Sequence, residues 1–155
     1  MKSGRILIAL MVIIGFFTLP VIGGSAVAAE QVITCATDAT WPPMEMVNEN
    51  KEIVGFDIDF LNAVAKEAGF KVEFKNTAWD GIFAGIAAGK YDAIISSVTI
   101  TDERKKTMDF SIPYINAGQV LIVPKDSSAV LIADLKGKSV GAQIGTTGAR
   151  EVKKA

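Results

Sequence analysis

The sequence predicts an α/β protein built around an open, largely parallel sheet. Short apolar runs of strand length alternate along the chain with helical stretches, and the helical stretches end at glycines. This alternation is typical of parallel sheets, because each parallel strand is reached through a crossover that is usually a helix. The 155 residues are 50% hydrophobic and 21% charged, so the chain can bury a core and falls in the class of globular proteins.

The expected elements follow one another along the chain. The first strand covers residues 31–37, where the lone Cys35 behaves as a small apolar residue, and residues 45–55 form a small hairpin around a polar turn. A helix then begins with Asp57 as its cap and ends at Gly69. The remaining elements are strands at 71–76, 93–97, 119–123 and 139–142, and a helix at 80–88 that stops at Gly89.

Residues 1–29 have the three regions of a secretory signal peptide. Lys2 and Arg5 precede an uncharged apolar stretch, and the helix-breaking Pro20 is followed by small residues up to Ala29. An uncleaved membrane anchor is the alternative. Pro20 and the glycines after it, however, shorten the continuous apolar helix below the roughly 20 residues that a membrane span requires. We therefore expect cleavage on export across the inner membrane and a periplasmic, mildly acidic mature protein.

The composition excludes several classes of function. Sixteen basic and 17 acidic residues are spread without a basic block, so nothing would hold nucleic acid by its phosphates. Without histidine the chain has no Ser-His or Cys-His pair and no histidine-ligated metal site, and one cysteine forms no intrachain disulfide. Much hydrolytic and metal chemistry is therefore unexpected, and no cofactor or metal is implied.

Polar and aromatic residues follow several expected strands at their carboxyl ends, the edge where open α/β sheets bind ligands. Each has an ordinary structural explanation when taken alone. A tryptophan is more often a core residue, and an arginine within a charged run is usually solvated. The candidates are Asp38 and Trp41 after the first strand, Trp79 after the second, Ser97, Thr99 and Arg104 after the third, and residues 145–148 after the fifth.

A set of short motifs in a fixed order adds a family resemblance. They are ATDATWPPME at 36–45, VGFDID at 54–59, WDGI at 79–82, SVTITDER at 97–104, DFS and PY at 109–114, and DLKGK at 134–138 followed by GTTG at 145–148. In this order they resemble the periplasmic amino-acid-binding proteins of ABC importers, a family that includes glutamine-, histidine- and lysine/arginine/ornithine-binding proteins. The resemblance covers nearly the whole chain after residue 29, and the motifs are specific as a set.

The resemblance implies the type II periplasmic binding protein fold, whose two lobes are joined by two crossing strands and close on the ligand. It implies a signal peptide at 1–29, a first ligand-binding lobe at 30–120, and a hinge crossing with the start of a second lobe at 121–155. Members of the family continue for about as much again. We therefore expect a C-terminally truncated chain, with the first lobe nearly complete and the second lobe only begun.

The resemblance also implies a function and partners. The protein would be the extracytoplasmic solute-binding component of an amino-acid ABC transporter, and it would not be an enzyme. It would bind a polar or basic L-amino acid between its lobes and deliver that ligand to an ABC permease in the inner membrane. The expected partners are this free amino acid, basic or glutamine-like, and the permease; no nucleic acid is expected, and the protein should be a monomer.

The family's contacts with the amino-acid backbone carry over by motif position. Arg104 would bind the α-carboxylate, for which a planar guanidinium is suited because it can bond both oxygens. Ser97 and Thr99 would offer a backbone carbonyl and a hydroxyl to the ammonium group. Thr147, at the start of a helix, would add an N–H and a hydroxyl to the carboxylate from the second lobe, where Gln143 is also placed.

The contacts with the ligand side chain would come from three residues. Trp41 and Trp79 match the family's aromatic walls, and Asp38 lies beside them in the sequence. A carboxylate next to two tryptophans suits a cationic side chain through ion pairing and cation–π attraction, which makes a basic amino acid the first choice. Glutamine remains an alternative, because an ionised Asp38 can equally accept from an amide.

Two other classes of function remain open on the same fold. A periplasmic dehydratase acting on prephenate or arogenate could use a carboxyl group as an acid. The ligand-sensing domain of a membrane receptor could bind an amino acid without transporting it. The complete set of contacts for an amino-acid backbone argues against the dehydratase. A gene beside permease and ATPase genes, or one fused to a kinase, would distinguish transport from sensing.

Overall fold

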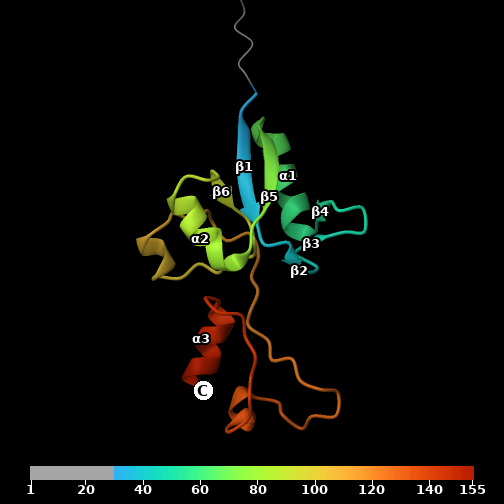
Figure 1. Ribbon diagram of the computed structural model, residues 1–155, viewed down its shortest axis with the longest axis vertical. Coiled ribbons are helices and arrows are strands. Elements are labelled where there is room, and N and C mark those ends of the chain that lie inside the picture. The colour runs from blue at the N-terminus through green and yellow to red at the C-terminus, as the bar shows by residue number, and fades with distance from the viewer. Residues whose placement is uncertain (1–29) are drawn as a thin grey trace, which may run out of the picture.

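Two small sheets organise residues 32–94 in the computed structural model, which describes residues 30–155 (Figure 1). The first sheet is parallel and has the order β5-β1-β6. The second is antiparallel and has the order β2-β3-β4. The expected signal peptide lies outside the described residues. The strands are β1 Val32–Thr37, β2 Thr40–Trp41, β3 Glu45–Val47, β4 Ile53–Val54, β5 Lys71–Asn76 and β6 Ala93–Ile94.

Strand β1 is the centre of the parallel sheet and pairs with β5 along its whole length, from Val32 opposite Lys71 to Thr37 opposite Asn76. Cys35 is fully buried within it, as the sequence predicts. Burial raises the pKa of the Cys35 thiol to about 12, so the thiol stays protonated and behaves as a core group. Because β1 and β5 are parallel, the residues after both strands emerge at the same edge of the sheet.

Two helices complete the first part of the fold: α1 Phe56–Ala68 packs along β5, and α2 Trp79–Ala87 contacts β6 (Figure 1). Helix α1 ends at Gly69, which adopts the left-handed conformation expected for a C-terminal glycine. Trp79 and Ile82 of α2 pack against Ala36 of β1 in the main buried cluster. This packing fixes the amino end of α2 at the carboxyl edge of the parallel sheet.

The expectation that Asp57 caps α1 is wrong. The helix begins at Phe56, with Gly55 in the capping position two residues before Asp57 and no side-chain cap. The N–H groups of Phe56 and Asp57 donate to the carbonyls of Pro43 and Met44, at 3.1 and 2.9 Å. Because the preceding loop's backbone satisfies these donors, the carboxylate of Asp57 is free to turn inward, where it is fully buried.

Gly55 permits this close approach, and its replacement tests the arrangement. A Cβ there would overlap the Met44 carbonyl oxygen, and the φ of 134° is one that L-residues rarely adopt. We expect Gly55→Ala to lower the free energy of unfolding by about 2 kcal/mol, measured by urea denaturation. Gly118→Ala is the control, because a Cβ at Gly118 meets no atom within 4 Å. Equal losses in both variants would contradict the prediction.

Three strand predictions differ from the structure. The strand expected at 93–97 is limited to β6, because Ser97 adopts a φ of 47° and leaves the sheet. The segments 119–123 and 139–142 are not strands, and those two expectations are wrong. A strand requires a neighbour to take its hydrogen bonds, and within residues 30–155 no strand lies beside either segment, so Val120 and Ile122 remain 85% and 90% exposed.

The rest of the chain after β6 is largely loop. It contains two short 3-10 turns, η1 Arg104–Lys106 and η2 Ile132–Leu135, and ends in helix α3 Thr147–Lys154. Figure 1 shows a long extended connection that leads away from the two sheets and returns to α3. Between residues 30 and 155 no helix is both long enough and apolar enough to cross a membrane.

Candidate ligand-binding site

Arg104 lies at the centre of the candidate site. It is the first residue of η1 and is only 8% exposed, whereas the adjacent Lys105 is exposed. Its guanidinium carbon lies 4.9 Å from the ring centroid of Phe83 and 5.4 Å from that of Trp79, within cation–π range. The guanidinium thus contacts two aromatic side chains of α2. The sequence predicted Trp79 for the site and missed Phe83.

The positive charge of Arg104 has no carboxylate within 4 Å among residues 30–155. Its Nη1 donates instead to the Thr99 carbonyl at 2.9 Å, and its Nη2 to the Gly145 carbonyl at 3.2 Å. Burial lowers the pKa of Arg104, and the positive charge of Arg150 lowers it further, while Glu103 opposes this. A buried cation without a counterion is costly, so this position favours an anionic ligand.

Helix α3 brings the distant end of the chain to the same place. Thr146 caps the helix, its Oγ1 accepting from the Ala149 N–H at 3.1 Å, and Thr147 is the first helical residue, as predicted. The Thr147 hydroxyl lies 3.3 Å from that of Thr99 and accepts from the Gln119 amide at 3.1 Å. The structure therefore brings together Thr99, Arg104 and Thr147.

The two predicted tryptophans differ in their surroundings. Trp79 is 7% exposed and packs edge-on against Phe83, with the ring centroids 5.0 Å apart. Its indole Nε1 is buried without a hydrogen-bond partner among the described residues and faces Gly145, where a Cβ would lie 3.4 Å away. Trp41, in β2, is 43% exposed and makes no ring contact or side-chain hydrogen bond with the other predicted residues.

Asp38 is buried, at 3% exposure, and both of its carboxylate oxygens are used within the protein. Oδ1 accepts from the Thr40 hydroxyl at 2.8 Å, and Oδ2 accepts from the Trp79 N–H at 3.2 Å. The second bond places a negative charge at the N-terminus of α2, where the helix dipole favours it. Asp38 therefore fixes the position of Trp79, whatever contact it makes with a ligand.

The remaining predicted residues lie in loops. The Ser97 N–H and hydroxyl both donate to Oδ2 of Asp57, at 2.6 and 3.2 Å. Gln143 is exposed, and its side chain makes no hydrogen bond within residues 30–155; only its backbone carbonyl is used, by Thr146. The structure thus does not bring the Gln143 side chain to Arg104.

Sequence reasoning missed a polar group around Ser97, which we term the carboxyl cluster: the buried Glu45, Asp57 and Ser96, the half-buried Tyr114 and the exposed Ser97. Oε1 of Glu45 accepts from the Ser96 hydroxyl at 2.8 Å, and Oδ2 of Asp57 accepts from the Tyr114 hydroxyl at 2.9 Å. Burial, together with the nearby charge of Asp57, raises the pKa of Glu45 to about 8. Glu45 and Asp57 both lie in motifs that carry the family resemblance. A glutamate in a hairpin and an aspartate at the start of a helix are usually exposed, so nothing in the sequence indicated that these two are buried.

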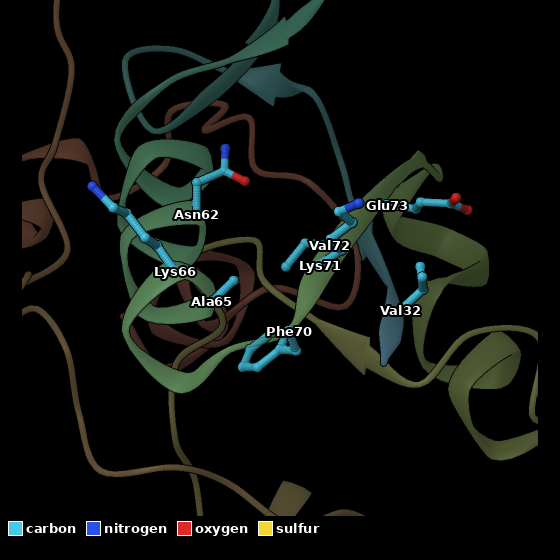
Figure 2. Close-up of a pocket in the computed structure, with 8 residues that line it drawn as sticks. All are labelled: Val32, Asn62, Ala65, Lys66, Phe70, Lys71, Val72 and Glu73. Carbon is cyan, nitrogen blue, oxygen red and sulfur yellow. The ribbon is translucent and has the colours of Figure 1, made fainter. Parts of the chain in front are cut away.

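A cavity of about 290 Å³ lies elsewhere, between α1 and the amino end of β5 (Figure 2). Its lining includes Asn62, Lys66 and Phe70, and none of the candidate ligand-binding residues. Since α/β sheets bind ligands at the carboxyl ends of their strands, this cavity is at the wrong end of the sheet to be the predicted site.

Comparisons with known proteins identify the family of the chain. Residues 33–155 match the model of the bacterial extracellular solute-binding proteins, family 3. A probable histidine-binding protein of Neisseria gonorrhoeae is 42% identical over 80% of this chain and 47% of its own length. The arginine-binding protein 1 of an ABC transporter from Escherichia coli is 42% identical over 77% of this chain and 49% of its own length. The chain therefore spans about half the length of these curated relatives.

Solved structures give the same result. An ancestral arginine-binding protein bound to arginine aligns with a TM-score of 0.77 and 48% identity, over 81% of this chain and 56% of the other. The arginine-, lysine-, histidine-binding protein of Geobacillus stearothermophilus aligns with a TM-score of 0.77 and 44% identity, over 80% and 53% of the two chains. The fold is that of the two-lobed periplasmic binding proteins, matched over about half of the length of these solved structures. The chain belongs to the bacterial extracellular solute-binding proteins, family 3.

Proposed function

We propose that this chain supplies the first lobe, residues 30–120, and the hinge crossing with the start of the second lobe, residues 121–155, of the solute-binding component of an amino-acid ABC importer. The protein binds a polar or basic L-amino acid between its lobes, outside the cytoplasm, and delivers it to a permease in the inner membrane. It acts as a monomer, with residues 1–29 as its cleaved signal peptide.

The buried guanidinium of Arg104 is the observation that carries this proposal. It is enclosed by Trp79 and Phe83, bonds carbonyls from two distant segments, and has no carboxylate within 4 Å among residues 30–155. The α-carboxylate of an amino acid supplies the missing negative charge in a planar form that matches the guanidinium. The hydroxyls of Thr99 and Thr147 lie close enough to contact the same ligand backbone.

Support for a basic ligand comes from the relatives and from the site. Relatives are named for binding arginine, histidine and cystine, and the ancestral protein was solved with arginine and with glutamine. In this chain the carboxylate of Asp38 lies beside Trp79, and Trp41 is exposed enough to close over a ligand. We propose arginine first among the basic amino acids, with glutamine as the alternative.

Calorimetry tests this function in a two-lobe protein in which residues 30–155 continue through the second lobe of an arginine-binding relative. L-Arginine should bind, and agmatine, which is arginine without its carboxylate, should bind at least about a hundredfold more weakly, because Arg104 then lacks its anion. Equal binding of the two would reject Arg104 as the carboxylate site. Failure of all basic amino acids and of glutamine to bind would reject the proposed function.

Asp38→Asn tests the proposed side-chain preference in the same two-lobe protein. Asparagine keeps an acceptor for Thr40 or Trp79 but removes the charge, so arginine affinity should fall about tenfold or more while glutamine affinity changes little. Asp80→Asn, which alters an exposed carboxylate in the first turn of α2, is the control and should leave both affinities unchanged. If both ligands weaken equally, Asp38 acts only by holding α2.

A dehydratase on the same fold is the second class of function to be tested. One solved relative is described as an ancestral amino-acid-binding protein that was a precursor of cyclohexadienyl dehydratase, with a TM-score of 0.74 and 42% identity. The raised pKa of Glu45 gives the chain a protonated carboxyl, but this group faces Ser96 and Asp57 and not Arg104. We therefore propose no catalytic role; product formation from prephenate or arogenate would overturn this.

A further inference from the structure

Asp57 lies directly behind the turn at Ser97, whose backbone carbonyl the family resemblance assigns to the ammonium group of the ligand in the proposed function. One oxygen, Oδ2, accepts from the Ser97 N–H, the Ser97 hydroxyl and the Tyr114 hydroxyl, at 2.6, 3.2 and 2.9 Å. Ser97 holds a φ of 47°, which is uncommon for a residue other than glycine and costs free energy unless its surroundings enforce it. The hydrogen bonds from Ser97 to Asp57 hold the Ser97 backbone in this conformation.

Glu45 completes the support on the other side of Asp57. Its Oε1 accepts from the Ser96 hydroxyl, and that hydroxyl in turn accepts from the Asp38 N–H. Its Oε2 and the Oδ1 of Asp57 are both buried and lack any partner among the described residues if both groups are ionised. One proton held between the two carboxyl groups satisfies both oxygens, and a side-chain hydrogen bond to Asp57 is among the causes that raise the pKa of Glu45.

The backbone places the two carboxyl groups side by side. The Asp57 N–H donates to the Met44 carbonyl at 2.9 Å, which places Asp57 beside Glu45 and in the first turn of α1. Burial, together with the nearby charge of Asp57, raises the pKa of Glu45 to about 8, so Glu45 holds a proton at neutral pH. The other titratable groups facing the pair are Asp38 after β1, Cys35 in β1 and Tyr114 in the following loop, and burial raises the pKa of both Cys35 and Tyr114.

We propose that the buried pair of Asp57 and Glu45 positions the Ser97 backbone for the ligand's ammonium group, Asp57 by holding Ser97 and Glu45 by holding Asp57. This inference rests on the proposed function for its ligand, but the positioning itself is a property of the protein without ligand. Asp57 is a positioning residue in this scheme, because it is fully buried and acts through Ser97. Loss of the Asp57 acceptor oxygen, or ionisation of Glu45, disturbs the turn.

Amide hydrogen exchange, measured by NMR in the full chain, tests the role of Asp57. Asp57→Ala should speed exchange of the Ser97 amide about tenfold or more relative to the amides of β1, because that N–H loses its acceptor. Asp57→Asn, which keeps an acceptor oxygen, should restore part of the protection even if the alanine variant folds poorly. Asp59→Ala, an exposed carboxylate in the same turn of α1, is the control. Unchanged Ser97 exchange in both Asp57 variants would overturn the proposal.

A pH series tests the role of Glu45 in the same samples. Exchange of the Ser97 amide, corrected for its intrinsic pH dependence, should accelerate above about pH 8 in the parent chain, where Glu45 ionises, and not in Glu45→Gln. Identical profiles for the two chains would overturn the proposal. Binding of the basic amino acids and of glutamine is measured in the two-lobe protein with the same variants: if none of them binds while Ser97 exchange responds as described, the proposed function fails and the positioning role stands.

Discussion

Replacing Arg104 with alanine should weaken binding of L-arginine to the two-lobe protein by about 2 to 5 kcal/mol, the usual effect of leaving a buried charge without its partner. The ligand's carboxylate would then be desolvated against Trp79 and Phe83 with no cation to meet it. Isothermal titration calorimetry at fixed salt concentration measures the loss directly.

Two further variants define what Arg104 contributes. Arg104→Lys should recover only part of the affinity, because an ammonium group cannot reproduce the planar fork that bonds two oxygens at once. Lys106→Ala, two residues along in η1 and exposed, should leave affinity within about twofold, since solvated charges contribute little. Unchanged affinity in Arg104→Ala would show that Arg104 does not bind the carboxylate and is an ordinary charged residue.

The stability of the folded protein should fall as pH rises from about 5 to 9, and Glu45→Gln should remove most of this fall. The pKa of Glu45 is raised from its ordinary 4.5 to about 8, so between these values the folded state holds a proton that the unfolded state has released. The contribution is fully present below pH 4.5 and is lost as pH rises through 8. We expect an effect on the order of 3 kcal/mol.

Urea denaturation at a series of pH values measures this effect. Glutamine keeps an acceptor for Ser96 and offers Asp57 a permanent N–H donor, so Glu45→Gln should match the parent near pH 5 and exceed it near pH 9. Glu49→Gln, an exposed residue in the turn of the same hairpin, should keep the parent's slope. A parent slope that persists in Glu45→Gln would show that other groups cause it.

The sequence predicted well those parts of the fold that depend on local pattern. The strand at 71–76 and the glycine that ends α1 are confirmed, because alternating burial and a left-handed C-terminus have local sequence signals. The strands expected at 119–123 and 139–142 were wrong, because a strand also requires a neighbouring strand. Apolar residues such as Ile122 do not indicate whether such a neighbour is present.

The candidate site was predicted less completely than the fold. Arg104, Thr99 and Thr147 come together as the motifs implied, since motif order reflects the three-dimensional arrangement of a family. Phe83 was missed although it lies four residues after Trp79 on one face of α2, a spacing that predicts contact. Asp57 was misassigned because a cap and an inward-facing first-turn residue differ by only two positions, and only the contact of Gly55 with Met44 decides between them.

Arg104 hydrogen-bonds two backbone carbonyls from different segments. Ligand binding at Arg104 is therefore coupled to the docking of these two segments against each other. Thr99 belongs to the segment that follows the parallel sheet and Gly145 to the approach to α3, so one side chain joins them. A carboxylate that takes the Nη2 donor must replace the Gly145 carbonyl or share the donor with it. By reciprocity, an anion that displaces the Gly145 carbonyl weakens this docking by the same factor by which the docking weakens anion binding.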